Sequence, residues 1–198
     1  MLRKIRELRE KYGPLHRLMA RGGRLAEFVR SRPLLQKAFE DFKPDILDPE
    51  EFRKSLVEDI GNAKEQVLIY SPFTHAEIIA KESWLMDYLL RAKNRGVKVK
   101  VYTRTPELFK GEAAEYQSKN IKTMESYGFE VFRRKQMHEK AVIIDMDVAY
   151  LGTLNVLSRL KPEKGGDYML RFENPELVKS FYTFLETLAQ TSELEEEI

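Results

Sequence analysis

The chain has 198 residues, of which 42% are hydrophobic and 11% aromatic, enough to form the core of one ordinary domain, so a wholly disordered chain is excluded. The 34 Lys and Arg residues nearly balance the 32 Asp and Glu residues, so the net charge of +2 does not identify a partner. The absence of cysteine excludes a disulfide framework, a thiolate zinc site and a cysteine nucleophile.

The first part of the chain is the basic part. Residues 1–43 hold 12 Lys or Arg against 5 Asp or Glu, a net charge of +7, and helical patterns cover 2–11 and 24–42. We place a boundary near Pro44, giving a basic helical arm or linker over 1–44 and a catalytic domain over 45–198. A charge-rich helix pair is most often only solvated, and this one could also link to a larger polypeptide. We favour contact with a phosphate backbone, because Arg suits that task.

The N-terminal sequence MLRKIRELREKYG carries a charge every second or third residue and has no apolar run. This pattern fits neither a signal peptide nor a membrane span. We therefore expect a cytoplasmic protein that makes no membrane contact.

Strand and helix patterns alternate after the arm. Period-two or short apolar runs predict strands, and amphipathic runs predict helices. Strands are expected at 67–71, 97–103, 129–133, 140–145, 149–153 and 167–172. Helices are expected at 49–63, after the N-cap Asp48, at 77–95 and 112–127, which are closed by Gly96 and Gly128, and at 175–191. This order indicates an α/β fold with a mixed β-sheet flanked by helices on both faces.

The chemistry concentrates in the segment HEKAVIIDMDVAYLGTLN, which runs from His138 to Asn155. His138 and Lys140 are two residues apart, so on a strand they would point to the same side. Asp145 ends that strand, and Thr153 and Asn155 stand together at the end of the next one. An imidazole, an ammonium and an amide are thus expected to converge at a sheet edge.

This set of groups suits phosphodiester cleavage. The transition state gathers negative charge on the non-bridging oxygens, which Lys140 and Asn155 can stabilise without a metal. A neutral His138 can attack phosphorus and form a phosphohistidine, which divides one difficult displacement into two easier ones. Lys140 alone would be an ordinary surface base, so its role depends on His138.

The same residues resemble the phospholipase D superfamily, whose signature is HxKxxxxD followed by GSxN. Residues 138–145 match the first half, and GTLN at 152–155 matches the second with Thr153 in place of Ser. The resemblance covers roughly Gln66 to the C-terminus and favours the branch of nucleases with a single motif. It implies that Asp167, at the position of a Glu twelve residues past Asn155, orients the catalytic histidine, and that Asp145 supports the site.

The resemblance also implies a homodimer. The family's site uses two such motifs related by a twofold axis, whereas this chain carries one and shows no internal repeat. His138 of each subunit would then meet across the axis, one as nucleophile and the other as general acid and base.

The loop SPFTHAE follows the first long strand, at the kind of edge where α/β proteins bind ligands. We consider Ser71, Phe73 and His75 as substrate-binding residues there, together with Lys140, Thr153 and Asn155. A base could stack on Phe73 or Tyr102. His75 could equally cap the helix that begins near Glu77.

The sequence therefore favours a metal-independent nuclease that acts on DNA or RNA, preferably single-stranded, with no metal and no cofactor. One alternative is a non-enzymatic module that positions nucleic acid for a helicase or another ATPase. A phospholipid-cleaving enzyme is a weaker alternative, because those relatives usually carry two motifs in one chain. No group of metal-ligating residues has a recognisable spacing.

Overall fold

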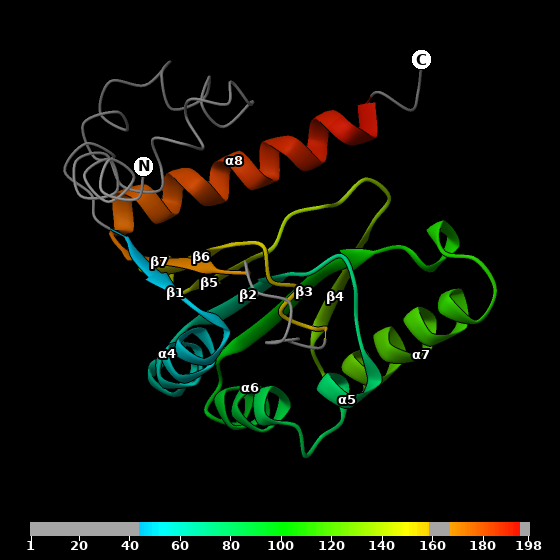
Figure 1. Cartoon of the computed structure of the whole chain (residues 1–198), viewed down its shortest axis with the longest axis horizontal. Helices are drawn as coiled ribbons and strands as arrows, with labels where there is room; N and C mark the ends of the chain where they lie inside the picture. The colour runs from blue at the N-terminus through cyan, green and yellow to red at the C-terminus, as the bar shows by residue number, and fades with distance from the viewer. Residues whose placement is uncertain (1–43, 159–166, 195–198) are drawn as a thin grey trace, which may run out of the picture.

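The computed structural model describes residues 44–158 and 167–194, which form a seven-stranded sheet with helices on both faces (Figure 1). This confirms the predicted fold class, while the predicted basic arm lies outside the described residues except for Pro44. The strands are β1 (Asp45–Leu47), β2 (Gln66–Tyr70), β3 (Lys98–Arg104), β4 (Glu130–Arg134), β5 (Ala141–Ile144), β6 (Val148–Gly152) and β7 (Met169–Glu173). The helices are α4 (Pro49–Asn62), α5 (Ala76–Ile79), α6 (Trp84–Asn94), a short 3-10 turn η1 (Pro106–Leu108), α7 (Glu112–Ser126) and α8 (Pro175–Leu194).

The sheet is mixed, with the strand order β1-β7-β6-β5-β2-β3-β4. Strands β2, β3 and β4 run parallel to one another. In the other half of the sheet, the pairs β2–β5, β5–β6, β6–β7 and β7–β1 are all antiparallel. The carboxyl ends of β2, β3, β4 and β6 therefore lie at the same edge as the amino ends of β5 and β7. All the loops that carry the predicted site residues leave from this edge, apart from the one that begins at Asp145.

Helix α8 lies across one face of the sheet, and α4, α5, α6 and α7 cover the other (Figure 1). Each face has its own apolar core. The larger core contains Phe52, Leu56 and Ile60 of α4, and the smaller one contains Leu177, Val178 and Leu185 of α8. None of the helices within 44–158 and 167–194 is both long and apolar enough to cross a membrane.

Local signals set the helix ends as the sequence predicts. Asp48 caps α4 by accepting the amides of Glu50 and Glu51, and the Glu51 carboxylate accepts the Asp48 amide in return. Gly96 and Gly128 follow α6 and α7 with φ values of 97° and 78°, which a glycine adopts without steric cost.

The structure differs from the predicted elements in two places. The helix expected over 77–95 is divided into α5 and α6, because Ala80 leaves helical geometry and Ser83 begins a new helix by accepting the Met86 amide. Residues 45–47, which lie outside the expected strands, form the edge strand β1 on β7. A three-residue strand gives too short a periodic pattern to be recognised in a sequence.

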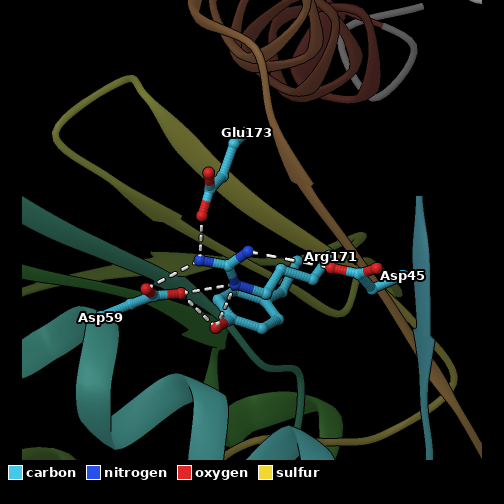
Figure 2. A network of polar contacts seen from close by, with 5 residues as sticks. Asp45, Asp59, Arg171 and Glu173 are labelled. Atoms are coloured by element: carbon cyan, nitrogen blue, oxygen red, sulfur yellow. Dashed lines mark hydrogen bonds and ion pairs between the residues drawn. The ribbon is translucent and has the colours of Figure 1, made fainter. Parts of the chain in front are cut away.

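A polar network fastens α4 to β6 and β7 (Figure 2). The Arg171 guanidinium donates to both carboxylate oxygens of Asp59, at 2.8 and 2.9 Å, and its Nε also donates to the Tyr150 hydroxyl at 3.1 Å. Tyr150 donates to Asp59, Arg171 also pairs with Glu173, and Asp45 lies 3.9 Å from Nη1. The hydrogen bonds to Asp59 raise the pKa of Arg171, so the guanidinium stays charged.

We predict that Asp59→Asn lowers the free energy of unfolding by about 2–4 kcal/mol, because it leaves a largely buried guanidinium without its main counter-charge. Only 16% of the Arg171 side chain and 13% of the Asp59 side chain are exposed. The matched control is Asp45→Asn, which removes a carboxylate that is 69% exposed and should cost less than about 1 kcal/mol. Urea unfolding of both variants checks this, and equal losses would show that the network does not stabilise the fold.

Candidate active site

The segments that carry the signature residues meet at one edge of the sheet because of the strand register. Tyr70 at the end of β2 pairs with Ala141 at the start of β5, and Ala141 pairs with Leu151 near the end of β6. Gly152, the last residue of β6, pairs with Met169 at the start of β7. The residues before β5, after β6 and before β7 are thereby brought side by side.

His138 and Lys140 lie in the loop before β5 and not on the strand, which begins at Ala141. The loop bends so that the Lys140 ammonium donates to the His138 carbonyl at 2.9 Å, while the His138 amide donates to the Glu139 carboxylate at 2.8 Å. The His138 side chain is exposed, and Lys140 is half-buried. An accessible imidazole and a partly desolvated cation in one loop form an arrangement that can receive an anionic substrate.

The pKa of Lys140 lies below its ordinary value. Burial is the largest cause, the positive charge of Arg104 is the next, and Glu139 and Asp167 act in the opposite direction. Lys140 therefore lies close enough to both Arg104 and Asp167 to sense their charges. Because the pKa is lowered, the ammonium loses its proton at a lower pH than an ordinary lysine does.

Gly152 and Thr153 fix the end of β6 against the start of β7. A Cβ atom at Gly152 would lie 2.1 Å from the Tyr168 carbonyl oxygen, so no larger residue fits without moving the backbone. The Thr153 hydroxyl donates to the Asp167 carboxylate at 2.8 Å and accepts the Tyr168 amide at 3.1 Å. The hydroxyl that Thr153 shares with Ser thus orients Asp167.

Asp167 is held near the site without bonding His138. Its carboxylate accepts a hydrogen bond from Thr153, and its charge reaches Lys140. Among the described residues, no hydrogen bond joins Asp167 to the His138 imidazole. The role that the resemblance implies for Asp167 therefore stays a prediction.

Among the described residues, the Oδ1 atom of Asn155 is the one buried side-chain acceptor without a hydrogen-bond partner. An unpaired buried oxygen costs free energy, so such atoms usually have a functional reason. The turn after Asn155 is held in place, since the Ser158 amide donates to its carbonyl at 2.9 Å. The amide side chain is thus presented on a fixed turn with bonding capacity left over.

Asp145 lies at the other end of β5 from the loop that holds His138 and Lys140. Its carboxylate accepts the amides of Lys64, Glu65 and Gln66, at 2.7, 2.8 and 2.8 Å. These bonds hold the entry to β2, and Asp145 itself adopts a φ of 53°, in the left-handed region. Asp145 thus joins β5 to the start of β2 at a distance from the imidazole, and the supporting role expected for it stays a prediction.

The loop after β2 contains the other predicted substrate contacts. Ser71 has no exposed surface, because its hydroxyl donates to the Phe73 carbonyl and accepts the Leu157 amide. It therefore ties this loop to the turn that carries Asn155 and cannot touch a substrate directly. His75 caps α5, its Nδ1 accepting the Glu77 amide at 3.3 Å, which was one of the two roles expected for it.

The two aromatic candidates differ in position. Tyr102 is only 6% exposed and stacks between Tyr70 and Phe132, with centroids 4.5 and 4.9 Å away, so its ring has no free face. Burial raises the pKa of Tyr102 to about 12. Phe73 is half-buried in the loop after β2, where Phe109 meets it edge to face at 5.9 Å. Phe73 thus keeps the position expected of a substrate contact.

Sequence reasoning missed Arg104 and the polar cluster behind it. Arg104 ends β3 at the site edge, and its Nε donates to the Met137 carbonyl at 2.7 Å. Behind it, Gln117 of α7 bonds Thr74, Thr103 and the Arg104 carbonyl, which holds the loops after β2 and β3 together. The sequence feature that could have indicated Arg104 is a positively charged residue at the carboxyl end of a strand, in a sheet whose neighbouring strands run parallel.

Within 44–158 and 167–194, no group of three or more His, Cys, Asp or Glu residues is arranged to hold a metal ion. The polar groups that the structure brings to the site edge are an imidazole, an ammonium, an amide, a guanidinium and two carboxylates, those of Glu139 and Asp167. Cationic and neutral donors therefore dominate, as binding of a phosphate group requires.

Comparison with known proteins identifies the family. The sequence model described as "Cardiolipin synthase, PLD-like domain" matches residues 56–188, well over half of the chain. The chain therefore belongs to this phospholipase D-like family and so to the phospholipase D superfamily, a superfamily of phosphodiesterases.

Among the curated proteins, cardiolipin synthase B of Escherichia coli K12 is 29% identical over 141 residues. The match covers 64% of this chain and 33% of that protein, and cardiolipin synthase B of Shigella flexneri gives the same figures. The chain thus spans about a third of the length of the curated relatives that it matches.

Solved structures show the same fold. Nuc from Salmonella typhimurium, a phospholipase D family member, has a TM-score of 0.53 at 22% identity, covering 73% of this chain and 93% of that one. NucT from Helicobacter pylori gives 0.54 at 19%, covering 73% and 94%. Polyphosphate kinase from Porphyromonas gingivalis gives 0.55 at 17%, covering 82% of this chain and only 28% of the larger one. At these identities the likeness concerns the fold alone.

We predict that Asp145→Asn lowers the free energy of unfolding by about 1–2 kcal/mol. The two charged carboxylate oxygens of Asp145 accept three backbone N–H groups, whereas the asparagine side chain has a single neutral oxygen to accept them. Asn tolerates the left-handed backbone, so the change isolates the loss of hydrogen bonds. Asp147→Asn, at an exposed position two residues on, is the control. Urea unfolding compares the two variants; an unchanged Asp145→Asn would mean that these bonds add nothing to stability.

Proposed function

We propose that this protein is a metal-independent nuclease that cleaves DNA or RNA through a phosphohistidine intermediate. The observation that carries the proposal is the convergence of the His138 loop, Lys140 and the Asn155 turn at one sheet edge. The exposed imidazole supplies a nucleophile. Lys140 and the Asn155 amide supply donors for the non-bridging oxygens, on which charge accumulates in the transition state.

The reaction proceeds in two displacements. The neutral His138 nitrogen attacks phosphorus, a bond from nitrogen to phosphorus forms, and the bond to the leaving oxygen breaks. A second histidine protonates that oxygen and then takes a proton from water, which attacks phosphorus and releases the His138 nitrogen. The products are an alcohol and a phosphate monoester, so one water is consumed for each bond cleaved.

The second histidine comes from another copy of the chain. One signature motif is present per chain, and two catalytic histidines are needed for the two proton transfers. In a homodimer with a twofold axis through the site edge, His138 of each subunit fills one role. The unpaired Oδ1 of Asn155 is consistent with a donor that the single chain does not provide.

Two features support nucleic acid as the substrate. Residues 1–43 carry a net charge of +7, from 12 basic and 5 acidic residues, which favours binding to a phosphate backbone. Single strands are favoured, because Phe73 beside the site can stack with an unpaired base.

Phospholipid cleavage or transfer is a second candidate function. The observation that favours it is the 29% identity to cardiolipin synthase B together with the description of the matching family. The same histidine chemistry would serve a phospholipid, because its phosphodiester has the same reacting atoms. Whether the substrate is a nucleic acid or a phospholipid depends on how the protein binds the parts of the substrate other than the reacting phosphate.

We predict that the wild type cleaves labelled single-stranded DNA or RNA in the presence of EDTA and that His138→Ala loses about 10³-fold or more of that rate. The loss follows because no other group nearby can form the covalent intermediate. A gel assay with single- and double-stranded DNA and RNA and with phospholipid vesicles names the substrate. The control is Lys98→Ala, an exposed change at the start of β3, at the opposite edge of the sheet.

Three results would contradict the proposal. Cleavage that stops in EDTA and returns with magnesium would exclude the metal-independent mechanism. Turnover of phospholipid alone would replace the nuclease by the second candidate. Binding of nucleic acid with no cleavage of any substrate would indicate a non-enzymatic module.

A further inference from the structure

Arg104 is fixed at the site by two contacts that involve only part of its guanidinium. Nε donates to the carbonyl of Met137, the residue before His138, at 2.7 Å. The guanidinium carbon lies 5.1 Å from the centre of the Phe73 ring, a cation–π distance. Its backbone is also tied down, since Gln117 donates to the Arg104 carbonyl at 3.1 Å. The terminal nitrogens Nη1 and Nη2 have no hydrogen-bond partner among the described residues.

The charge of Arg104 is not balanced by a bound carboxylate in the part of the chain that the structure describes. The two arginines at the end of the neighbouring strand differ in this respect. Arg133 bonds Glu125 at 2.7 Å, and Arg134 bonds Glu186 at 3.0 Å. Arg134 also lies over the Tyr102 ring at 4.4 Å. Of these three arginines, only Arg104 is held by a carbonyl and a ring and lacks a carboxylate partner among the described residues.

The charge of Arg104 also acts on the cation that the proposed mechanism uses. After burial, its positive charge is the largest cause of the lowered pKa of Lys140, so the two side chains repel each other. Two like charges held close together favour an anion between or beside them, because the anion removes the repulsion and gains two charge-assisted bonds. A guanidinium with two free nitrogens matches the two non-bridging oxygens of a phosphate.

We propose that Arg104 is a second phosphate-binding residue of this site, with Nη1 and Nη2 donating to the same phosphate group that Lys140 binds. Its Nε bond to Met137 at the same time positions the loop that carries His138. This inference rests on the proposed function and extends it, because it assigns the site two cations for one phosphodiester. Arg104 does not take part in bond making or breaking.

The test measures binding of inorganic phosphate in EDTA by calorimetry, with no cleavage involved. We expect wild type to bind phosphate and Arg104→Met to bind it about tenfold or more weakly, because a charge-assisted bidentate contact is lost. Arg104→Lys keeps the charge but not the fork, so it should show an intermediate affinity. Arg133→Met, which removes a paired arginine at the same end of the sheet, is the matched control and should bind as wild type does.

A second readout separates this role from a purely structural one. With ¹³C-labelled lysine, and with the Lys140 signal assigned from a Lys140→Arg sample, the pKa of Lys140 should rise in Arg104→Met and stay lowered in Arg104→Lys. Unchanged phosphate affinity and an unchanged Lys140 titration in a folded Arg104→Met would overturn the inference, as would a wild type that binds no phosphate. If phosphate binding depends on Arg104 and yet no substrate is cleaved, the proposed function fails and this inference stands.

Discussion

The close approach of two backbones at the ends of β6 and β7 determines the geometry of the site. Gly152 leaves no room for a Cβ atom, which would lie 2.1 Å from the Tyr168 carbonyl, and Thr153 continues the contact by bonding Asp167 and Tyr168. The Gly152 amide also donates to the Lys140 carbonyl at 3.2 Å, so the same residue fixes the loop before β5. One glycine thus sets the spacing of the three segments on which the reactive groups stand.

Charge is used in two different ways in this fold. In the network of α4, β6 and β7, Arg171 is matched by Asp59 with two short bonds and by Glu173, and the result is a rigid attachment. At the site edge, Lys140 and Arg104 donate to backbone carbonyls and have no carboxylate hydrogen-bond partner among the described residues. Burial, followed by the positive charge of Arg104, lowers the pKa of Lys140. Uncompensated charge costs stability, and such costs are tolerated where a ligand can remove them.

Local patterns in the sequence were enough to predict most of the fold. The caps at Asp48, Gly96 and Gly128 and the apolar strand AVII carry their signals within a few residues, and the structure confirms these elements. The three-residue strand β1 could not be found, because its pairing with β7 depends on residues far away in the chain. The division of the helix at 80–83 was missed for a related reason: the apolar spacing continues through the break.

For the candidate site, the sequence indicated which segments lie together, but it did not show the contacts of the residues in them. The spacing of His138, Lys140 and Asn155 places them at one edge, but their positions in loops and turns were not visible from a period-two pattern. Asp145 matches the signature in sequence and yet acts on the amides of 64–66 at the far end of β5. Ser71 was expected to contact substrate but is buried, whereas Arg104 was not singled out and lies at the site edge. Burial and hydrogen-bond partners depend on the folded chain and could not be inferred from local sequence patterns.

The stereochemistry of cleavage at phosphorus distinguishes a covalent histidine intermediate from direct attack by water. A phosphorothioate linkage of known configuration, cleaved by the wild type in ¹⁸O-labelled water, reports the number of displacements at that atom. Two in-line displacements, first by His138 and then by water, each invert the centre, so the account predicts overall retention. Net inversion would mean that water attacks directly, and it would contradict a covalent histidine intermediate.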